Sequence, residues 1–161
     1  MKGDPKVIEL LNEALKAELT AINQYWLHYR LLDNLGVKKL AAFERHESID
    51  EMKHADRLAE RILFLDGLPN FQAINRLKVG ETVEEILRAD LALEMEAIPL
   101  LRDAIAHSES VRDYVSREIF ERILESEEEH VDFLEKQFDM IKRMGLPNYV
   151  QLQSKPAGEG D

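Results

Sequence analysis

The chain has 161 residues, of which 45% are hydrophobic and 33% charged, and its formal net charge is -11 at pH 7. This length suits one globular domain, or one subunit of a larger assembly, and excludes a multidomain enzyme. The negative charge disfavours nucleic acid and anionic membrane surfaces as partners and favours cations, although many proteins are acidic only to stay soluble.

The chain contains no cysteine. Disulfides, thiolate metal sites and thiol catalysis are therefore excluded, and a reducing cytoplasm fits. The segment Met1 to Pro5 turns acidic at once and lacks the apolar core of a signal peptide. No stretch approaches the roughly 18 apolar residues of a membrane span. We therefore expect an unprocessed cytoplasmic protein.

Helix-capping and helix-breaking residues divide the chain into helices. Asp4, followed by a proline, opens a first helix over 5–35, which Gly36 ends. Apolar residues recur in it at alternating steps of three and four, the seam spacing of a bundle helix, and Glu18 occupies one seam position. A second helix over 37–66 carries ionisable residues in the middle of its seam.

The second half of the chain repeats this pattern after a long connection. Residues 67–81 show no sustained period and are too many for a tight turn, so we expect a crossover that returns the chain along the bundle. Thr82 and Glu85 form a capping box that opens a third helix over 83–107.

The last elements complete an all-α fold. Ser110 is expected to cap a fourth helix over 111–144, followed by a short fifth helix over 148–153 and a frayed tail over 154–161. The sequence therefore predicts a single domain over 1–161, a four-helix bundle with one long crossover and a short C-terminal helix.

The motif Glu-x-x-His places two metal-ligand types on one helix face, because residues three apart are surface neighbours. It occurs at Glu51 with His54 and at Glu127 with His130. One copy is weak evidence in so acidic a chain. A shared spacing is stronger evidence. The members of three pairs lie 76 residues apart: Glu18 and Glu94, Glu51 and Glu127, and His54 and His130.

This repeat indicates two helical hairpins whose ionisable residues meet near mid-bundle. Four carboxylates in an apolar seam would each cost several kcal/mol to desolvate, roughly, unless something cancels their charge. Two divalent cations cancel it. Carboxylates with one histidine per ion suit iron or manganese, as in di-iron carboxylate bundles.

Other candidates carry weaker signals. Tyr25 lies two turns beyond the first seam glutamate and either bonds a ligand, donates an electron or simply packs in the core. His46 and Asp50 lie four apart and form either an accessory metal site or a solvated pair. His28 and His107 belong to no recognisable constellation.

With these residues in place, the chain resembles the ferritin-like superfamily and, within it, the bacterioferritins. The resemblance covers nearly the whole chain and is most specific over 46–57 and 90–94. It implies that Glu18 and His54 hold one iron and that Glu94 and His130 hold the other. It further implies that Glu51 and Glu127 bridge the two ions.

The resemblance also implies a second cofactor, haem b. Met52, together with its copy from a two-fold-related subunit, would ligate the haem iron, whereas spacing alone would read an outward methionine as a packing residue. Leu19, Asn23 and Trp26, on the adjacent face of the first helix, are candidates for the same pocket.

A hollow shell of 24 subunits, with haem at its two-fold interfaces, is implied as well. Fe²⁺ and O₂ or H₂O₂ would be the substrates of a ferroxidase that stores Fe³⁺ as mineral, and haem would assist iron release with a reductase or ferredoxin partner. A rubrerythrin-like peroxidase would need cysteine-ligated iron, and a small DNA-protecting relative would place its metals between subunits. A non-catalytic haem-binding bundle and a di-manganese or mixed-metal oxidase stay open as alternatives.

Overall fold

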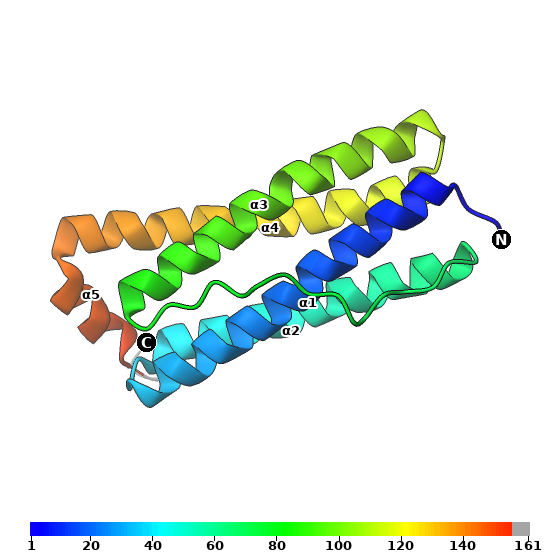
Figure 1. The fold of residues 1–161 in the computed structure, drawn as a ribbon. Helices are drawn as coiled ribbons and strands as arrows, with labels where there is room; N and C mark the ends of the chain where they lie inside the picture. Colours follow the sequence, from blue (N-terminus) through cyan, green and yellow to red (C-terminus); the bar gives the residue numbers. More distant parts are fainter. Residues whose placement is uncertain (156–161) are drawn as a thin grey trace.

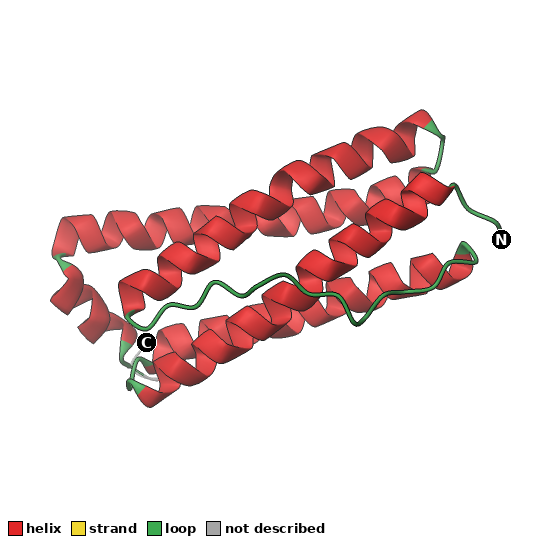
Figure 2. Ribbon diagram, viewed as in Figure 1, coloured by secondary structure: helices red, strands yellow, loops and turns green. Residues whose placement is uncertain are grey.

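The structure, a computed structural model, describes residues 1–155. Five helices follow in chain order: α1 (Pro5–Asn34), α2 (Lys38–Phe64), α3 (Val83–Ser110), α4 (Tyr114–Met144) and α5 (Leu146–Gln153). This part of the chain contains no strand (Figure 2), so the predicted all-α class is confirmed. The expected tail over 154–161 lies outside the described residues from 156 onward.

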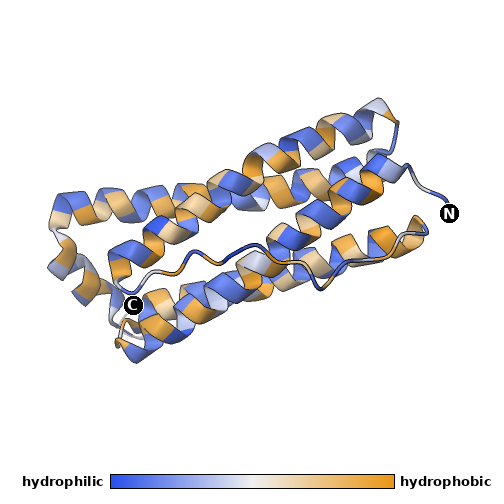
Figure 3. Ribbon diagram, in the orientation of Figure 1, coloured by the Kyte–Doolittle hydropathy of each residue, from blue (hydrophilic) through white to orange (hydrophobic). Residues whose placement is uncertain are grey.

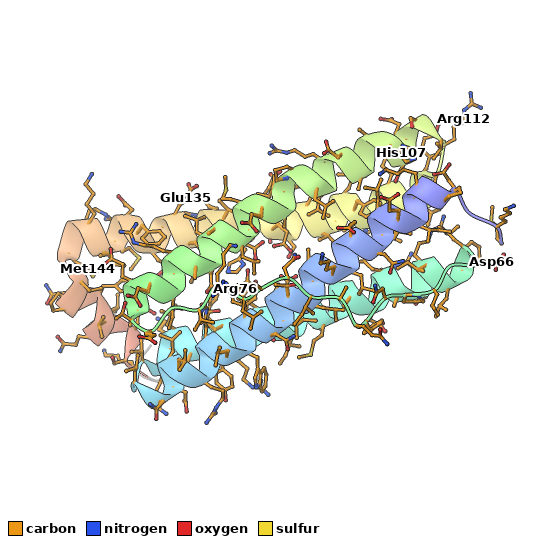
Figure 4. The ribbon with its side chains drawn as sticks, in the orientation of Figure 1. Asp66, Arg76, His107, Arg112, Glu135 and Met144 are labelled. Atoms are coloured by element: carbon orange, nitrogen blue, oxygen red, sulfur yellow. The ribbon has the colours of Figure 1, made fainter. Side chains whose placement is uncertain are left out.

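The helices form two hairpins that pack side by side (Figure 1). Helix α1 pairs with α2, and α3 pairs with α4, while residues 65–82 run back along the length of the bundle beside α1. This crossover makes α2 and α3 run in the same direction. The labelled Asp66 and Met144 mark opposite ends of the bundle, and α5 folds across the Met144 end (Figure 4). No helix within residues 1–155 has the length and apolar character needed to cross a membrane.

Two of the expected helix caps are present. The Asp4 carboxylate accepts a hydrogen bond from the backbone N–H of Val7 at 2.9 Å, which satisfies one of the free donors at the start of α1. Thr82 and Glu85 form the reciprocal capping box at the start of α3.

The expected cap of the fourth helix is wrong. Ser110 is the last residue of α3, and its hydroxyl donates to the carbonyl of His107 at 2.6 Å. Asp113 caps α4 by accepting from the backbone N–H of Ser116 at 3.0 Å. The chain turns at Arg112, whose φ of 62° ends α3 three residues later than its seam pattern suggested.

The fifth helix also begins earlier than expected, at Leu146 instead of 148. Gly145 has a φ of 84°, so a single residue turns the chain out of α4, and a new helix starts directly after it. Tyr149 of α5 is fully buried, and its hydroxyl donates to the Gln137 side chain of α4 at 2.7 Å.

Two apolar clusters fill the bundle on either side of its middle. One includes Leu11, Leu58 and Phe120, and the other includes Leu32 and Leu87. Every long helix carries both hydrophobic and hydrophilic residues (Figure 3). Burying one leucine stabilises the fold by roughly 1.5–3 kcal/mol. The clusters thus stabilise a bundle whose middle is ionisable.

Candidate metal centre

Six ionisable side chains from all four long helices meet between the two apolar clusters. These glutamates and histidines lie in two overlapping groups of possible ligand atoms, and within each group the atoms lie within 4.8 Å of one another. The first group is Glu18, Glu51, His54 and Glu127, and the second is Glu94, Glu127 and His130. Glu127 belongs to both, the position that a bridging carboxylate would occupy.

His54 approaches three carboxylates at the more accessible side of the centre. Its Nδ1 lies 3.2 Å from Glu51 Oε2, 3.5 Å from Glu18 Oε2 and 3.9 Å from Glu127 Oε1. The His54 side chain is 20% exposed, whereas those of the three glutamates are 5% exposed or less. One imidazole therefore faces three nearly dry carboxylates from three helices.

His130 occupies the corresponding place in the second group. Its Nδ1 lies 3.2 Å from Glu94 Oε1 and 3.6 Å from Glu47 Oε2. The Tyr25 ring and the imidazole pack in a T-shaped arrangement, with 5.2 Å between ring centroids. Tyr25 is fully buried, and its hydroxyl has no hydrogen-bond partner in the part of the chain that the structure describes.

Several buried atoms at the centre have no hydrogen-bond partner among residues 1–155. They are Glu18 Oε2, Glu94 Oε2, Glu127 Oε1 and His130 Nε2. Unpaired polar atoms in a dry interior cost about 1–3 kcal/mol each, and more when charged. Divalent cations would satisfy these atoms, and carboxylates with one imidazole per ion are a donor set that suits iron or manganese. The residues present therefore fit a two-metal centre.

The protonation of the metal-free centre follows from its burial. Burial and the charges of Glu51 and Glu47 raise the pKa of Glu127 well above its ordinary value. Burial also raises the pKa of Glu94, although His130 opposes that shift. Burial alone would lower the pKa of His130, but Glu94 and the surrounding carboxylates raise it to about 9. The centre therefore holds protons that metal ions would displace.

Sequence reasoning missed Glu47. Its side chain is 14% exposed, and burial raises its pKa. It occupies the seam of α2 one turn before Glu51, which was a usable signal. It has no partner at the 76-residue offset, because residue 123 is the apolar Ile123.

A second buried group was also missed. His28, Glu44 and Asp90 are fully buried and lie together, one each on α1, α2 and α3. The expectation that His28 belongs to no constellation is therefore wrong. Glu44 and Asp90 lie in neither Glu-x-x-His motif, and only the packing of three helices brings them to His28.

His46 and Asp50 stay outside the centre. His46 Nε2 lies 3.2 Å from Asp50 Oδ2, and the His46 side chain is 69% exposed. Within residues 1–155, no third donor completes a metal-binding group with them. This favours the solvated-pair interpretation. His107 is partly exposed and bonds Asp4 at 3.1 Å.

The residues expected to line a haem pocket lie on the outer side of the first hairpin. Met52 is 42% exposed and Trp26 is 38% exposed. Asn23 is exposed and Leu19 half-buried. A thioether and an indole at the surface leave this face open for a ligand or a second copy of the chain.

Comparison with known proteins agrees with the fold. The family model described as a ferritin-like domain matches residues 8–144. The match and the bundle define the class as ferritin-like. The chain is 48% identical to a bacterioferritin of Brucella melitensis, with 100% of both chains covered. It is 50% identical to one of Streptomyces coelicolor, with 99% of both covered, and 49% identical to one of Rhodobacter capsulatus, with 97% of both covered. The chain therefore belongs to the bacterioferritin family.

Proposed function

We propose that the protein is an iron-storage ferroxidase that oxidises Fe²⁺ at the buried centre and retains the Fe³⁺ as mineral inside a shell of its own copies. One observation carries this proposal: four carboxylates and two imidazoles converge from four helices, and four of their atoms lack hydrogen-bond partners within residues 1–155. Bacterioferritin relatives of nearly equal length support iron storage as the purpose.

In this proposal Fe²⁺ is the substrate, and the chain's residues bind and orient it. Glu18 and His54 would hold one ion, and Glu94 and His130 the other. Glu127 would bridge them, since it belongs to both groups of ligand atoms, and Glu51 would be the second bridge. Four carboxylates balance two divalent ions and stabilise the more highly charged Fe³⁺ further, which favours oxidation.

Electrons and protons balance with either oxidant. Each Fe²⁺ loses one electron. O₂ takes up two electrons and two protons to give H₂O₂, or H₂O₂ takes up two of each to give two waters. The carboxyl protons of the metal-free centre leave when the ions bind, because carboxylates must be ionised to act as ligands. Tyr25, whose ring packs against the His130 imidazole, would donate a hydrogen bond at the centre during this step.

Haem b is the second part of the proposal. Met52 and its copy in a two-fold-related subunit would hold the haem through their thioethers, and Trp26, Asn23 and Leu19 would help to form its pocket. The exposure of the Met52 side chain fits this role. Haem supplies one-electron transfer, which would return electrons to stored iron for its release. A cytoplasmic location and a reductase or ferredoxin partner stay predictions.

An anaerobic Fe²⁺ titration of the metal-free protein tests the centre. Each sample is then exposed to oxygen while the absorbance of Fe³⁺ is followed. We expect the fast phase to end at about two iron ions per chain and to be lost in Glu127→Ala. Glu129→Ala, which removes an exposed glutamate from the same helix, is the matched control and should behave as the native chain.

The same titration separates the alternatives. A native chain without a break, or with the same slow rate as Glu127→Ala, would leave a haem-binding or structural bundle. The titration is repeated with Mn²⁺ in air. If its break occurs at lower ion concentrations than the break with Fe²⁺, the result would favour a di-manganese or mixed-metal oxidase.

A further inference from the structure

The crossover is attached to α1 by polar side chains one helical turn apart. Thr20 Oγ1 accepts a hydrogen bond from the backbone N–H of Asn75 at 2.9 Å, and Gln24 Oε1 accepts one from that of Lys78 at 2.9 Å. Both side chains belong to fully buried residues of α1. Arg76, labelled in Figure 4, lies between these attachments, where the crossover passes the middle of the bundle. This part of the crossover is therefore held in place against α1, and it is called the wall below.

Buried groups hold the attachments in one orientation. His28 Nε2 accepts from the backbone N–H of Gly80 at 3.0 Å, so the imidazole proton lies on Nδ1, which donates to Asp90 Oδ1 at 2.8 Å. The same carboxylate oxygen accepts from Gln24 Nε2 at 3.0 Å. Asp90 thereby orients the Gln24 amide so that its oxygen faces the backbone of Lys78.

The wall borders a cavity that connects the surface to the metal centre. The cavity, called the acidic passage below, has a volume of about 80 Å³, enough for several waters. Asn75 lines it together with six glutamates, namely Glu13, Glu18, Glu51, Glu94, Glu96 and Glu127. Glu13, Asn75 and Glu96 are exposed, whereas the other four glutamates are the buried ones of the centre. Three of these four, Glu18, Glu94 and Glu127, each have a carboxylate oxygen without a hydrogen-bond partner among the described residues. The described residues that line the cavity include no lysine or arginine.

One cation lies at the outer end of the acidic passage. Lys78 Nζ is 3.0 Å from Glu96 Oε1, and the Lys78 side chain is only 34% exposed. Gln24 anchors the backbone of Lys78, so the ammonium group can contact only groups within one side-chain length of this fixed point. It neutralises one of the two exposed carboxylates that an arriving metal ion would meet first.

We propose that Lys78 controls the entry of divalent cations into the acidic passage by occupying Glu96 until a divalent ion displaces it. The inference rests on the proposed function of the centre and deepens it. A divalent ion has twice the Coulomb attraction of the ammonium for the same carboxylate, whereas a monovalent ion has no such advantage. Lys78 would thus lower the rate of entry overall and discriminate against monovalent ions.

The test measures entry without oxidation. Co²⁺ is not oxidised by air in such a site, and its absorbance changes when carboxylates and imidazoles bind it, so stopped-flow mixing with metal-free protein gives an association rate. We expect Lys78→Met to raise this rate at least about threefold at low ionic strength and the increase to shrink in high salt. Lys136→Met, which removes an exposed lysine paired on α4, should leave the rate unchanged.

A second variant acts in the opposite direction. Glu96→Gln removes the carboxylate that captures the ion, so we expect it to lower the Co²⁺ association rate by at least about twofold. In Fe²⁺ oxidation, Lys78→Met should lower KM and leave kcat unchanged, because it touches none of the six ligands. Circular dichroism should show native helix content in both variants.

The outcomes distinguish the two proposals. If the native chain binds two Co²⁺ and Glu127→Ala does not, but Lys78→Met and Lys136→Met bind at the native rate, the entry proposal alone is overturned. A Glu96→Gln chain that binds Co²⁺ as fast as the native chain overturns it too. A native chain that binds no Co²⁺ contradicts both the entry proposal and the proposed centre.

Discussion

At the scale of single residues, burial decides the chemistry of the centre. In the metal-free fold the pKa is raised for two carboxyls and two imidazoles of the centre, namely Glu94, Glu127, His54 and His130. Burial raises the pKa of the two carboxyls. Neighbouring carboxylates raise the pKa of the two imidazoles, although burial opposes that shift. Each group therefore holds its proton more tightly in the folded than in the unfolded chain. The same groups must release their protons to bind metal, which couples metal affinity to pH.

This protonation predicts how stability depends on pH. Because the folded metal-free chain binds more protons than the unfolded chain, its free energy of unfolding should fall as pH rises from the ordinary glutamate value of 4.5 to about 9. Urea unfolding of the metal-free protein at several pH values measures this. Glu127→Gln, which removes one such group, should show a shallower fall. A stability that is flat or rises over this range would contradict the assignment.

Residue types also explain what could be predicted here. The six ligand candidates carried a double signal, residue type and a shared offset, so the sequence alone was enough to propose them. Glu47 carried only its place in a seam, and the group of His28, Glu44 and Asp90 carried no sequence signal. Contacts between residues far apart in the chain depend on helix packing, which residue type does not specify.

At the scale of elements, the periodicity of apolar residues predicted which segments are helices, whereas particular hydrogen bonds set where each helix begins and ends. Asp113 shows the difference. Its carboxylate accepts from the Ser116 backbone and from Arg61, at 2.7 Å, and Arg61 is 9% exposed. Asp113 therefore caps α4 and also forms an ion pair with the buried guanidinium of Arg61. Because Arg61 belongs to α2, this ion pair is a tertiary contact that supports the cap. Ser110 offered the same local cap chemistry without that contact.

This difference gives a direct test. Asp113→Ala should destabilise the fold by about 2–4 kcal/mol, because it removes the cap of α4 and leaves Arg61 without its ion pair. Ser110→Ala, at the position first expected to be the cap, should change stability by less than about 0.5 kcal/mol. Urea unfolding of both variants makes the comparison. Equal effects would contradict the role of Asp113.

At the scale of the whole molecule, the proposed shell and haem depend on copies of the chain. Twenty-four copies of 18.6 kDa would give a particle of about 446 kDa, which analytical ultracentrifugation measures. A monomer or a dimer as the largest species would contradict storage inside a shell. The net charge of -11 per chain would make the shell strongly attractive to cations.

Haem binding has its own test. Met52→Leu keeps the size and apolar character of the side chain but removes the thioether, so the Soret absorbance of haem should be lost on reconstitution while the break in the Fe²⁺ titration is retained. Met95→Leu, which alters an exposed methionine of α3, should bind haem normally. Equal haem binding by both variants would contradict the proposal that Met52 holds the haem.

The sequence by itself determined the helical class, the two-hairpin repeat and the six candidate ligands, because the periodicity of apolar residues and the spacing of ionisable ones are properties of a linear chain. Only the tertiary structure decided that Glu47 joins His130, that Asp90 orients the side chains holding the crossover, and that Lys78 meets Glu96 beside the acidic passage. The reason is physical: a crossover without periodicity takes its path from the side chains against which it packs, and those lie on helices far away in sequence.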